Sequence, residues 1–486
     1  MPMSRARASK NCANCRAVKR RCDKQVPHCG QCLRQREKCP GYRDNWDLVF
    51  RNQTSETIQR SQKKQVSKAD RFPPPRLCMG PHMNEIGANY FLHHFVTGDQ
   101  SSSRGYLNYI PAVYSNDGEH PTLLASMAAV GLMALANSTK QAELASHARL
   151  KYTEAIRNVN AALASPTESI KDSTLMSIIS LGVFEHFSDF QSWVRHVRGA
   201  AALMVVRGKS QFRSPAAILM FHQVRTDLSI VCMHTSQQLP PGIEALQEEV
   251  SRHIDTSSAS WTMGVLATRC VKLLWHVDKN EEKVPWLDLF DQAVRLQEDF
   301  QLALGILAIQ EPYMTNCGDS LDPDLIYNNR YDLYRTPWAI RLWNNSRNLQ
   351  MIVCEIICYL TNKVFLVVPD LSIAVRAQIK ATLQETLCIM STLSDGILAS
   401  VPQILGVVST QSPGNGLAVD PPVSAGVAGG YMLVWGLYMV GKSPATGDKA
   451  RKWIIRRLGD IVENSGIALA QRLLDQIVEI DQVANQ

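Results

Sequence analysis

The chain has 486 residues, enough for two or three domains and a large core. Hydrophobic residues make up 45% of it and charged residues 20%, which is ordinary for a globular protein. The net charge of +7 is unevenly placed: residues 1–43 carry twelve Lys and Arg against Asp23 and Glu37, a net +10, which leaves −3 for the rest. We therefore expect a polyanionic partner for the N-terminal part and not for the body.

Residues 1–10 are polar and basic, so they do not resemble a secretory signal, and residues 1–11 are expected to form a disordered basic arm. The chain contains thirteen cysteines. Without an export signal, this number of cysteines indicates a reducing compartment in which thiols persist.

Six cysteines follow with the spacing C-x2-C-x6-C-x6-C-x2-C-x6-C, and the second half of this pattern repeats the first: Cys12, Cys15, Cys22, Cys29, Cys32 and Cys39. Thiolates are good ligands for Zn²⁺, which takes four ligands in a tetrahedron. Six thiolates are too many for one zinc and too few for two separate sites, so two zinc ions fit if two cysteines bridge them. So short a module has almost no core, and metal binding would supply its folding energy.

Two other interpretations of the cysteines are weaker. A disulfide-bonded module would allow fifteen pairings, but the sequence lacks a secretory signal. A redox C-x-x-C motif requires a thioredoxin-like βαβ context, which is missing. A structural zinc site is therefore the favoured prediction.

The spacing resembles the fungal binuclear zinc cluster (Zn2Cys6) family of transcription factors. The similarity includes the segments Cys15 to Asp23 and Cys39 to Arg43, with Pro27 two residues before Cys29. The resemblance implies that Cys12 and Cys29 bridge the two zinc ions. One ion would be bound by Cys12, Cys15, Cys22 and Cys29, and the other by Cys29, Cys32, Cys39 and Cys12. It also implies a short helix after each C-x2-C pair and a loop containing Pro27 between the two helices.

In this family the first helix points its C-terminal end into the DNA major groove. The resemblance implies that Lys19 contacts the guanines of a CGG triplet, whose O6 and N7 atoms are adjacent acceptors. Arg16, Arg20 and Arg21 would mainly bind phosphates, which position the module without reading sequence. Some members carry a second basic residue where this chain has Val18, so the groove contact would depend more on Lys19 and Arg20.

Residues 12–43 are thus expected to be a DNA-binding domain, residues 44–83 a flexible linker, and residues 84–486 a large all-α regulatory domain with breaks near 240 and at 409–422. No heptads follow Tyr42, so no coiled coil is expected there.

Helices are expected at 121–136, 139–164, from a cap at Asp172-Ser173 to about 187, from about Trp193 to 207, at 261–278 and at 286–305. Further helices are expected from Thr336-Pro337 to beyond 360, at 370–397, at 427–440 and at 448–480, and strands should be few.

Two apolar stretches could be mistaken for membrane spans. The run 123–136 is too short to cross a bilayer. Residues 423–441 lack charges over 19 positions, but Gly426, Gly429 and Gly430 interrupt their first half. We expect buried core helices and no membrane partner.

The body contains no H-E-x-x-H, P-loop, G-x-G-x-x-G or G-x-S-x-G motif, so no enzyme activity is expected. It resembles the helical regulatory domain of filamentous-fungal regulators at 181–185, 193–200 and 431–438. The resemblance implies a nuclear, sequence-specific regulator of RNA polymerase II transcription, with double-stranded DNA and the transcription machinery as partners. It leaves open whether the protein binds a single triplet or forms a homodimer through the helical body. The alternative is a helical effector-binding or enzymatic body that a zinc module tethers to nucleic acid.

Overall fold

The computed structural model describes residues 10–42, 82–96, 107, 109–278, 285–318, 322–368, 370–408 and 427–484. The chain divides between Gly80 and Pro81 into two compact units. Most of the expected basic arm, nearly all of the expected linker and the expected loop at 409–422 fall on residues 1–9, 43–81 and 409–426, outside the described part.

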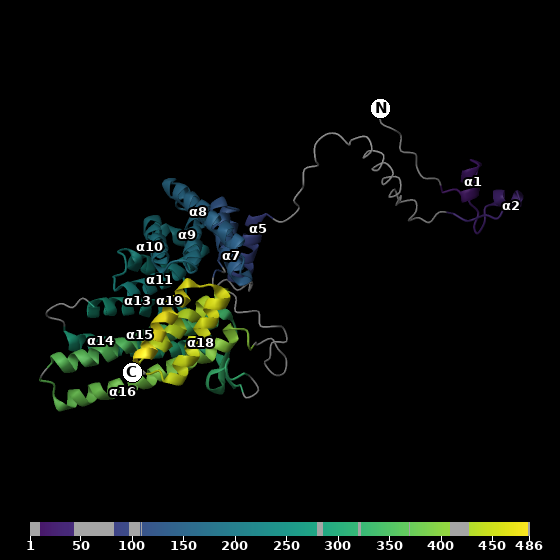
Figure 1. Cartoon of the computed structure of the whole chain (residues 1–486). Coiled ribbons are helices and arrows are strands. Elements are labelled where there is room, and N and C mark those ends of the chain that lie inside the picture. Colours follow the sequence, from purple (N-terminus) through teal and green to yellow (C-terminus); the bar gives the residue numbers. More distant parts are fainter. Residues whose placement is uncertain are drawn as a thin grey trace. The chain divides into compact units, whose positions relative to one another are not determined.

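The N-terminal unit contains two short helices, α1 (Ala13–Ala17) and α2 (Gly30–Arg34), which are labelled in Figure 1. Each begins directly after the first cysteine of a C-x2-C pair and contains the second. The helices therefore overlap the pairs, whereas the sequence comparison placed them after the pairs. The peptide bond between Val26 and Pro27, in the segment that joins them, is cis.

In the described part of the second unit, the regular structure is helical apart from one hairpin (Figure 1). Its first helices are α5 (Met83–Phe95), α6 (Ile110–Asp117), α7 (Pro121–Thr139), α8 (Ala142–Ala164), α9 (Asp172–Glu185), α10 (Phe190–Arg207), α11 (Pro215–Thr235) and α12 (Ile243–Val250). The later helices are α13 (Ala259–Asp278), α14 (Trp286–Gln310), α15 (Pro337–Val367), α16 (Ile373–Ile404), α17 (Val427–Lys442), α18 (Asp448–Ser465) and α19 (Ala468–Ala484). Two short 3-10 helices, Lys209–Arg213 and Tyr327–Asn329, lie between these elements.

The hairpin connects α14 to α15 and consists of β1 (Tyr313–Cys317) and β2 (Arg330–Tyr334). The strands are antiparallel, and their register pairs Tyr313 with Tyr334 and Cys317 with Arg330. The expectation that strands would be few is correct for the described residues.

Helix α7 lies at the centre of the N-terminal half of the body, where it packs against α5, α8 and α9. The contact with α5 is made by backbone atoms. A Cβ atom added at Gly131 would lie 1.8 Å from the carbonyl oxygen of Gly87, and one added at Gly87 would lie 2.5 Å from that of Ala128. Glycine is required at this crossing because any side chain would push the helices apart.

Helices α14, α15 and α16 run side by side in the C-terminal half (Figure 1). Helix α15 begins as expected: the Thr336 hydroxyl accepts a hydrogen bond from the Ala339 amide at 3.1 Å, and Pro337 is the first helical residue. Buried side chains from α5 to α19 form one continuous hydrophobic core.

The start of α9 differs from the sequence prediction. Lys171, and not Asp172, is the cap residue. The Asp172 carboxylate instead forms an ion pair with Arg207 at the end of α10, and both side chains are 5% exposed. The free amide of Ser173 donates to Asp117 Oδ2 of α6 at 2.7 Å. A residue distant in sequence supplies the cap, so the sequence pattern could not reveal it.

The predicted helix at 448–480 is two helices. Gly466 adopts a left-handed conformation with φ of 63° and ends α18. Glycine after a helix is the commonest such terminus, so this break could have been predicted.

Helix α7 has 19 residues, so the prediction that this segment is too short to cross a membrane is wrong. By length and composition, α7, α15 from Trp338 and α16 could all span a bilayer. In this fold, 72%, 50% and 61% of their most apolar windows are buried inside the body. The uncharged stretch at 423–441 contributes to α17, whose Leu433, Val434 and Leu437 are buried.

Candidate metal centre and nucleic-acid interface

The repeat in the cysteine sequence is also a repeat in the structure. After α1, Lys19 adopts a left-handed conformation with φ of 51°, and the next amide, of Arg20, donates to the carbonyl oxygen of Cys15 at 2.9 Å. After α2, Arg36 has φ of 53°, and the Glu37 amide donates to the carbonyl oxygen of Cys32 at 2.9 Å. Residues 17 positions apart therefore have the same local structure.

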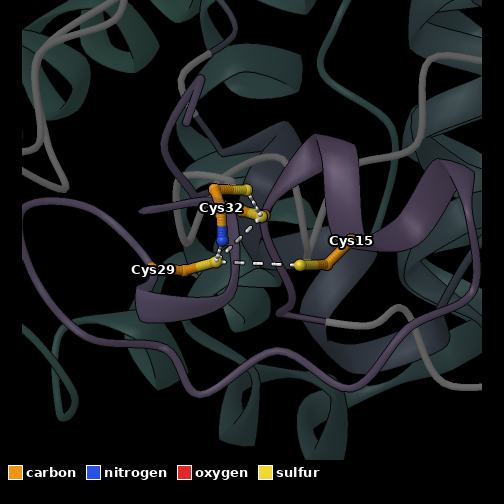
Figure 2. Close-up of side chains that lie close together, drawn as sticks. Cys15, Cys29 and Cys32 are labelled. Atoms are coloured by element: carbon orange, nitrogen blue, oxygen red, sulfur yellow. Dashed lines mark hydrogen bonds between the residues drawn. The ribbon is translucent and has the colours of Figure 1, made fainter. Parts of the chain in front are cut away.

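The two halves bring the six cysteine side chains together. All six are buried, and among residues 10–42 the hydrophobic side chain that packs against them is that of Tyr42. The sulfur atom of Cys29 lies 3.7 Å from those of Cys12 and Cys15, and the Cys12 and Cys32 sulfur atoms are also 3.7 Å apart. Figure 2 shows the sulfur atoms of Cys15, Cys29 and Cys32 pointing toward one another.

These distances fit zinc coordination. A tetrahedron of sulfur atoms about 2.3 Å from a central zinc has edges of about 3.8 Å. The ligand atoms of Cys12, Cys15, Cys29 and Cys32 all lie within 4.8 Å of one another, and those of Cys22, Asp23 and Cys29 form a second such group. Cys12 and Cys29 are the first residues of the two pairs, and each lies 3.7 Å from two sulfur atoms of the opposite half.

Without a metal, burial disfavours the charged form of the two central thiols, Cys12 and Cys29. Burial raises the pKa of Cys12 and raises that of Cys29 to about 12, so these two central thiols resist ionisation without a metal. Burial opposes ionisation of Cys22 too, but hydrogen bonds from the backbone of Cys12 and Lys24 outweigh it and lower the pKa of Cys22 to about 7. A metal ion that binds thiolates supplies the positive charge that this buried cluster needs.

Arg20 lies against the sulfur cluster. Its Nε donates to Cys15 Sγ at 3.4 Å and its Nη2 to Cys32 Sγ at 3.6 Å, and it forms an ion pair with Glu37. Its side chain is 24% exposed. Arg20 and Glu37 occupy equivalent positions in the two halves, so this ion pair joins the halves across the repeat. The sequence comparison assigned Arg20 to phosphate, and it did not anticipate this internal role.

The other predicted DNA-contacting residues lie at the surface. Lys19 and Arg21 are exposed, and Arg16 is half-buried. Val18 between them is 63% exposed. The C-terminal end of α1 therefore presents two free cationic side chains beside an apolar one, a surface suited to DNA phosphates and base edges.

Sequence reasoning missed four residues that connect parts of this unit. Asp23 Oδ1 accepts from the Gly30 amide at 2.9 Å, and a Cβ at Gly30 would lie 2.5 Å from Asp23 Oδ2. The Tyr42 hydroxyl donates to the carbonyl oxygen of Gln25 at 2.6 Å, and Asn14 Nδ2 donates to that of Lys38 at 3.2 Å. Glu37 is the fourth. The charge reversal between Arg20 and Glu37 at equivalent repeat positions is the signal that could have revealed their ion pair.

Among the described residues of the body, the polar and aromatic side chains of 193–198 and the thiols of Cys354 and Cys358 are the candidates for a catalytic site. Trp193 is buried, His196 Nε2 lies 3.1 Å from the Tyr152 hydroxyl, and Arg198 bonds to Thr235 and Gln237, so their side chains have separate partners. Burial raises the pKa of the Cys354 and Cys358 thiols, which makes them poor nucleophiles. In the described part of the chain, groups of cysteine, histidine and acidic residues that could hold a metal lie only in the N-terminal unit.

A small unit built around buried cysteine thiols, with exposed cationic residues just beyond one helix, has the features of a metal-binding and nucleic-acid-binding module. Comparison with known families agrees: residues 10–47 match the family model of the fungal Zn(2)-Cys(6) binuclear cluster domain. Residues 88–261, from α5 to the start of α13, match the fungal specific transcription factor domain. The chain therefore combines a zinc-binding, DNA-binding cluster with a transcription factor domain, the domain pair of a fungal DNA-binding transcription factor. Searches of curated proteins and of solved structures gave no match.

Two of the three sequence segments that suggested a regulatory body, 181–185 and 193–200, lie inside the matched range. The third, 431–438 in α17, lies outside it and stays a resemblance. Described residues between Met263 and Ile477 complete the same hydrophobic core without being part of the match.

Proposed function

We propose that this protein is a nuclear transcription factor that regulates RNA polymerase II genes by reading a CGG-type triplet in the DNA major groove. In this proposal residues 12–43 bind DNA, residues 44–83 are a linker and residues 84–486 regulate. The observation that carries it is the exposed pair Lys19 and Arg21 at the end of a helix whose other side holds the buried thiols.

The proposed cluster contains two zinc ions bridged by Cys12 and Cys29. One ion is completed by Cys15 and Cys22, and the other by Cys32 and Cys39. The Cys29–Cys15 and Cys12–Cys32 sulfur distances of 3.7 Å support this assignment, because each equals one tetrahedral edge between a proposed bridging thiolate and a ligand of one ion. The Cys12–Cys29 distance, also 3.7 Å, is the edge that the two proposed tetrahedra would share. Zinc analysis of the purified full chain should give two ions per chain, and a value of one would contradict the bridged cluster.

Lys19 is the proposed base-reading residue, and Arg16 and Arg21 are proposed phosphate contacts. Replacing Lys19 with Ala should weaken binding to a CGG-containing duplex by roughly 1–3 kcal/mol, the usual value of a good base contact. Binding to a duplex without the triplet should weaken much less. An electrophoretic mobility-shift titration of both duplexes measures the two effects, and equal losses on both would assign Lys19 to phosphate instead.

The salt dependence tests the extent of the interface. If about five phosphates are contacted, log K should fall with log[salt] at a slope of about −4 to −5. The match of residues 88–261 to the fungal specific transcription factor domain favours a regulatory body over the alternative of a tethered enzyme. Discrete promoter occupancy at CGG-containing sites would support the regulator, and diffuse occupancy would support the tether.

Pairing through the helical body is the alternative to binding as a single copy. The mass of the complex with a duplex that carries one triplet, and with one that carries two, distinguishes the two modes. A complex that contains two chains on one triplet would indicate pairing through the body.

A further inference from the structure

The body contains a cavity of about 450 Å³ whose wall is formed mainly by α11, α13 and α15, with Trp435 and Met439 from α17. The apolar side chains on its wall include Met233, Met263 and Ile352. This volume falls within the range of small-molecule sites, which are mostly apolar and carry a few polar groups that fix the ligand. The polar groups on the wall therefore indicate which ligand the cavity fits.

Arg225 of α11 is the most unusual polar group on the wall. Its side chain is 2% exposed. Its Nη1 donates to Gln247 Oε1 at 3.1 Å, its Nη2 lies 3.4 Å from His222 Nδ1, and its Nε has no hydrogen-bond partner. Neither partner is a carboxylate, and the salt bridges among the described residues do not include Arg225. A buried cation without an anion is costly, because burial removes its hydration and nothing in the protein replaces it.

The surroundings fix the guanidinium of Arg225 beside the cavity. It lies over the ring of Trp261, with its central carbon 4.7 Å from the ring centroid. It also packs on the backbone of α13, because a Cβ added at Gly264 would lie 1.7 Å from Nη2. Burial lowers the pKa of Arg225 to about 9, which still leaves it charged at neutral pH. The charge is therefore held in place, with little freedom to reach solvent.

A second buried arginine shows how this fold satisfies a cation when no ligand is needed. Arg347 of α15 is 3% exposed. Its Nη1 donates to the Tyr334 hydroxyl at 2.7 Å, to Asn344 Oδ1 at 3.1 Å and to the carbonyl oxygen of Gly396 at 3.0 Å. Arg347 is not among the residues that line the cavity. Three protein acceptors surround Arg347, whereas Arg225 has one good acceptor and a cavity beside it.

Of the two arginines on the wall, Arg225 is buried and Arg341 is half-buried, so Arg225 is the cation that has more to gain from an anion. Burial lowers the pKa of His222 to about 3 and that of His234 to about 4, so both are neutral at pH 7. The wall also carries Arg341, which donates to Gln223 Oε1 at 2.9 Å, and the carboxylates of Asp255 and Glu311. Asp255 is exposed and accepts from Ser257.

A further orphaned group points to a ligand. Asn348 Oδ1, on the same wall, is buried and has no hydrogen-bond partner. An acceptor without a donor complements a cation without an anion, since one molecule can supply both missing partners.

We propose that this cavity is a binding site for a small, largely apolar organic acid whose carboxylate is bound by Arg225. A hydroxyl or N–H group on the acid would donate to Asn348. The site goes beyond the proposed DNA-binding function, and its test needs no DNA, so the two proposals fail separately.

The test uses the zinc-loaded full chain and two matched probes, 4-phenylbutyrate and 4-phenylbutan-1-ol, which differ at the acid group. Isothermal titration calorimetry should show the acid binding at least about tenfold more tightly than the alcohol, the effect of one charge-assisted hydrogen-bonded pair. Equal binding of the two probes, or binding of neither, would overturn the proposal.

Two variants locate the binding. Arg225→Met should abolish the preference for the acid and should not lower the melting temperature of the free protein, because it removes an unpaired buried charge. The matched control Arg195→Met, at a side chain that is 72% exposed, should leave the preference unchanged. A preference that survives Arg225→Met would assign the anion site elsewhere.

The variant Thr226→Trp keeps the proposal testable if Arg225→Met does not fold. Thr226 is a half-buried residue on the cavity wall whose hydroxyl bonds within its own helix. A Trp at this position should fill the cavity and weaken both probes by at least about tenfold. Unchanged affinity for the acid would show that it binds outside the cavity.

Discussion

Residues 10–42 bury a single small cluster of side chains, the six cysteines with Tyr42 against them, whereas the body buries a continuous set that extends from Ala88 to Ile477. The first region has almost no apolar surface to remove from water, so its fold depends on the metal that its thiolates bind. The second depends on side-chain packing. The difference teaches that one chain can hold two compact units with different sources of stability, and we expect each unit to unfold without the other.

Metal removal should have the largest effect. Structural zinc contributes on the order of 10–16 kcal/mol to folding of small zinc domains, so a strong chelator should unfold residues 10–42. Hydrogen-exchange mass spectrometry of the full chain should show the amides of Arg20 and Glu37, which bond to the carbonyl oxygens of Cys15 and Cys32, losing protection. Amides in α7 should keep theirs. Simultaneous loss in both regions would contradict the separation.

The converse test removes packing from the body. Phe91 of α5 is fully buried, and Phe91→Ala should lower the free energy of unfolding by about 3–5 kcal/mol through lost apolar contact and a cavity. Denaturant unfolding followed by tryptophan fluorescence measures this. Leu150→Ala is the matched control, since Leu150 is 67% exposed and should change stability little. The zinc content should be unchanged in both variants, and zinc loss in Phe91→Ala would show that the regions are coupled.

A buried carboxyl group gives the body a pH dependence. Burial raises the pKa of Asp227 in α11 to about 6, against the opposing effects of Arg341 and of the hydrogen bond from Gln223. An unfolded Asp has a pKa of about 3.9. Between these values the folded body holds a proton that the unfolded chain has released. The contribution of Asp227 to the free energy of unfolding should therefore fall by roughly 3 kcal/mol as the pH rises from about 4 to about 6, and not further above that.

Asp227→Asn isolates this contribution, because the amide oxygen still accepts from Gln223 and carries no charge. The stability of the variant relative to the native protein should increase between pH 4 and pH 7. Parallel pH profiles for the two proteins would contradict the assignment. Eight of the nine tryptophans lie beyond residue 190, so fluorescence reports the body even where acid releases zinc from the other unit.

The two regions also differ in what their sequence reveals. Thiol spacing is a local signal with specific chemistry, and the structure buries all six predicted ligands together. Most helix positions in the body follow from apolar periodicity, and the Thr336-Pro337 start was predicted correctly. Interactions between residues distant in sequence could not be predicted in this way. Asp117 caps α9 from another helix, and the close contact of α5 with α7 requires Gly87 and Gly131 to face each other.

The role of Arg225 also depends on contacts between residues distant in sequence, so it could not be predicted from the sequence. Its neighbours Gln247, Trp261 and Gly264 come from two other helices, and whether it has an anionic partner depends on how those helices pack. A buried arginine and an exposed one look alike in a sequence. The structure is needed to distinguish Arg225 from Arg347 and from the exposed Arg195.

The smallest predicted effect separates two arginines that are adjacent in sequence. Arg21 is exposed, so Arg21→Ala should remove one phosphate contact and reduce the slope of log K against log[salt] by about 0.9, with no change in zinc affinity. Arg20 bonds to two cysteine sulfur atoms and to Glu37, so Arg20→Ala should weaken zinc retention against a chromophoric chelator. The loss of DNA affinity in Arg20→Ala should recover when zinc is in excess, whereas that in Arg21→Ala should not. A different result would contradict this assignment: Arg20→Ala lowers the salt slope as Arg21→Ala does and retains its zinc. Arg20 would then contact a phosphate in the DNA complex, and its hydrogen bonds to the cysteine sulfur atoms would be present only in the free protein.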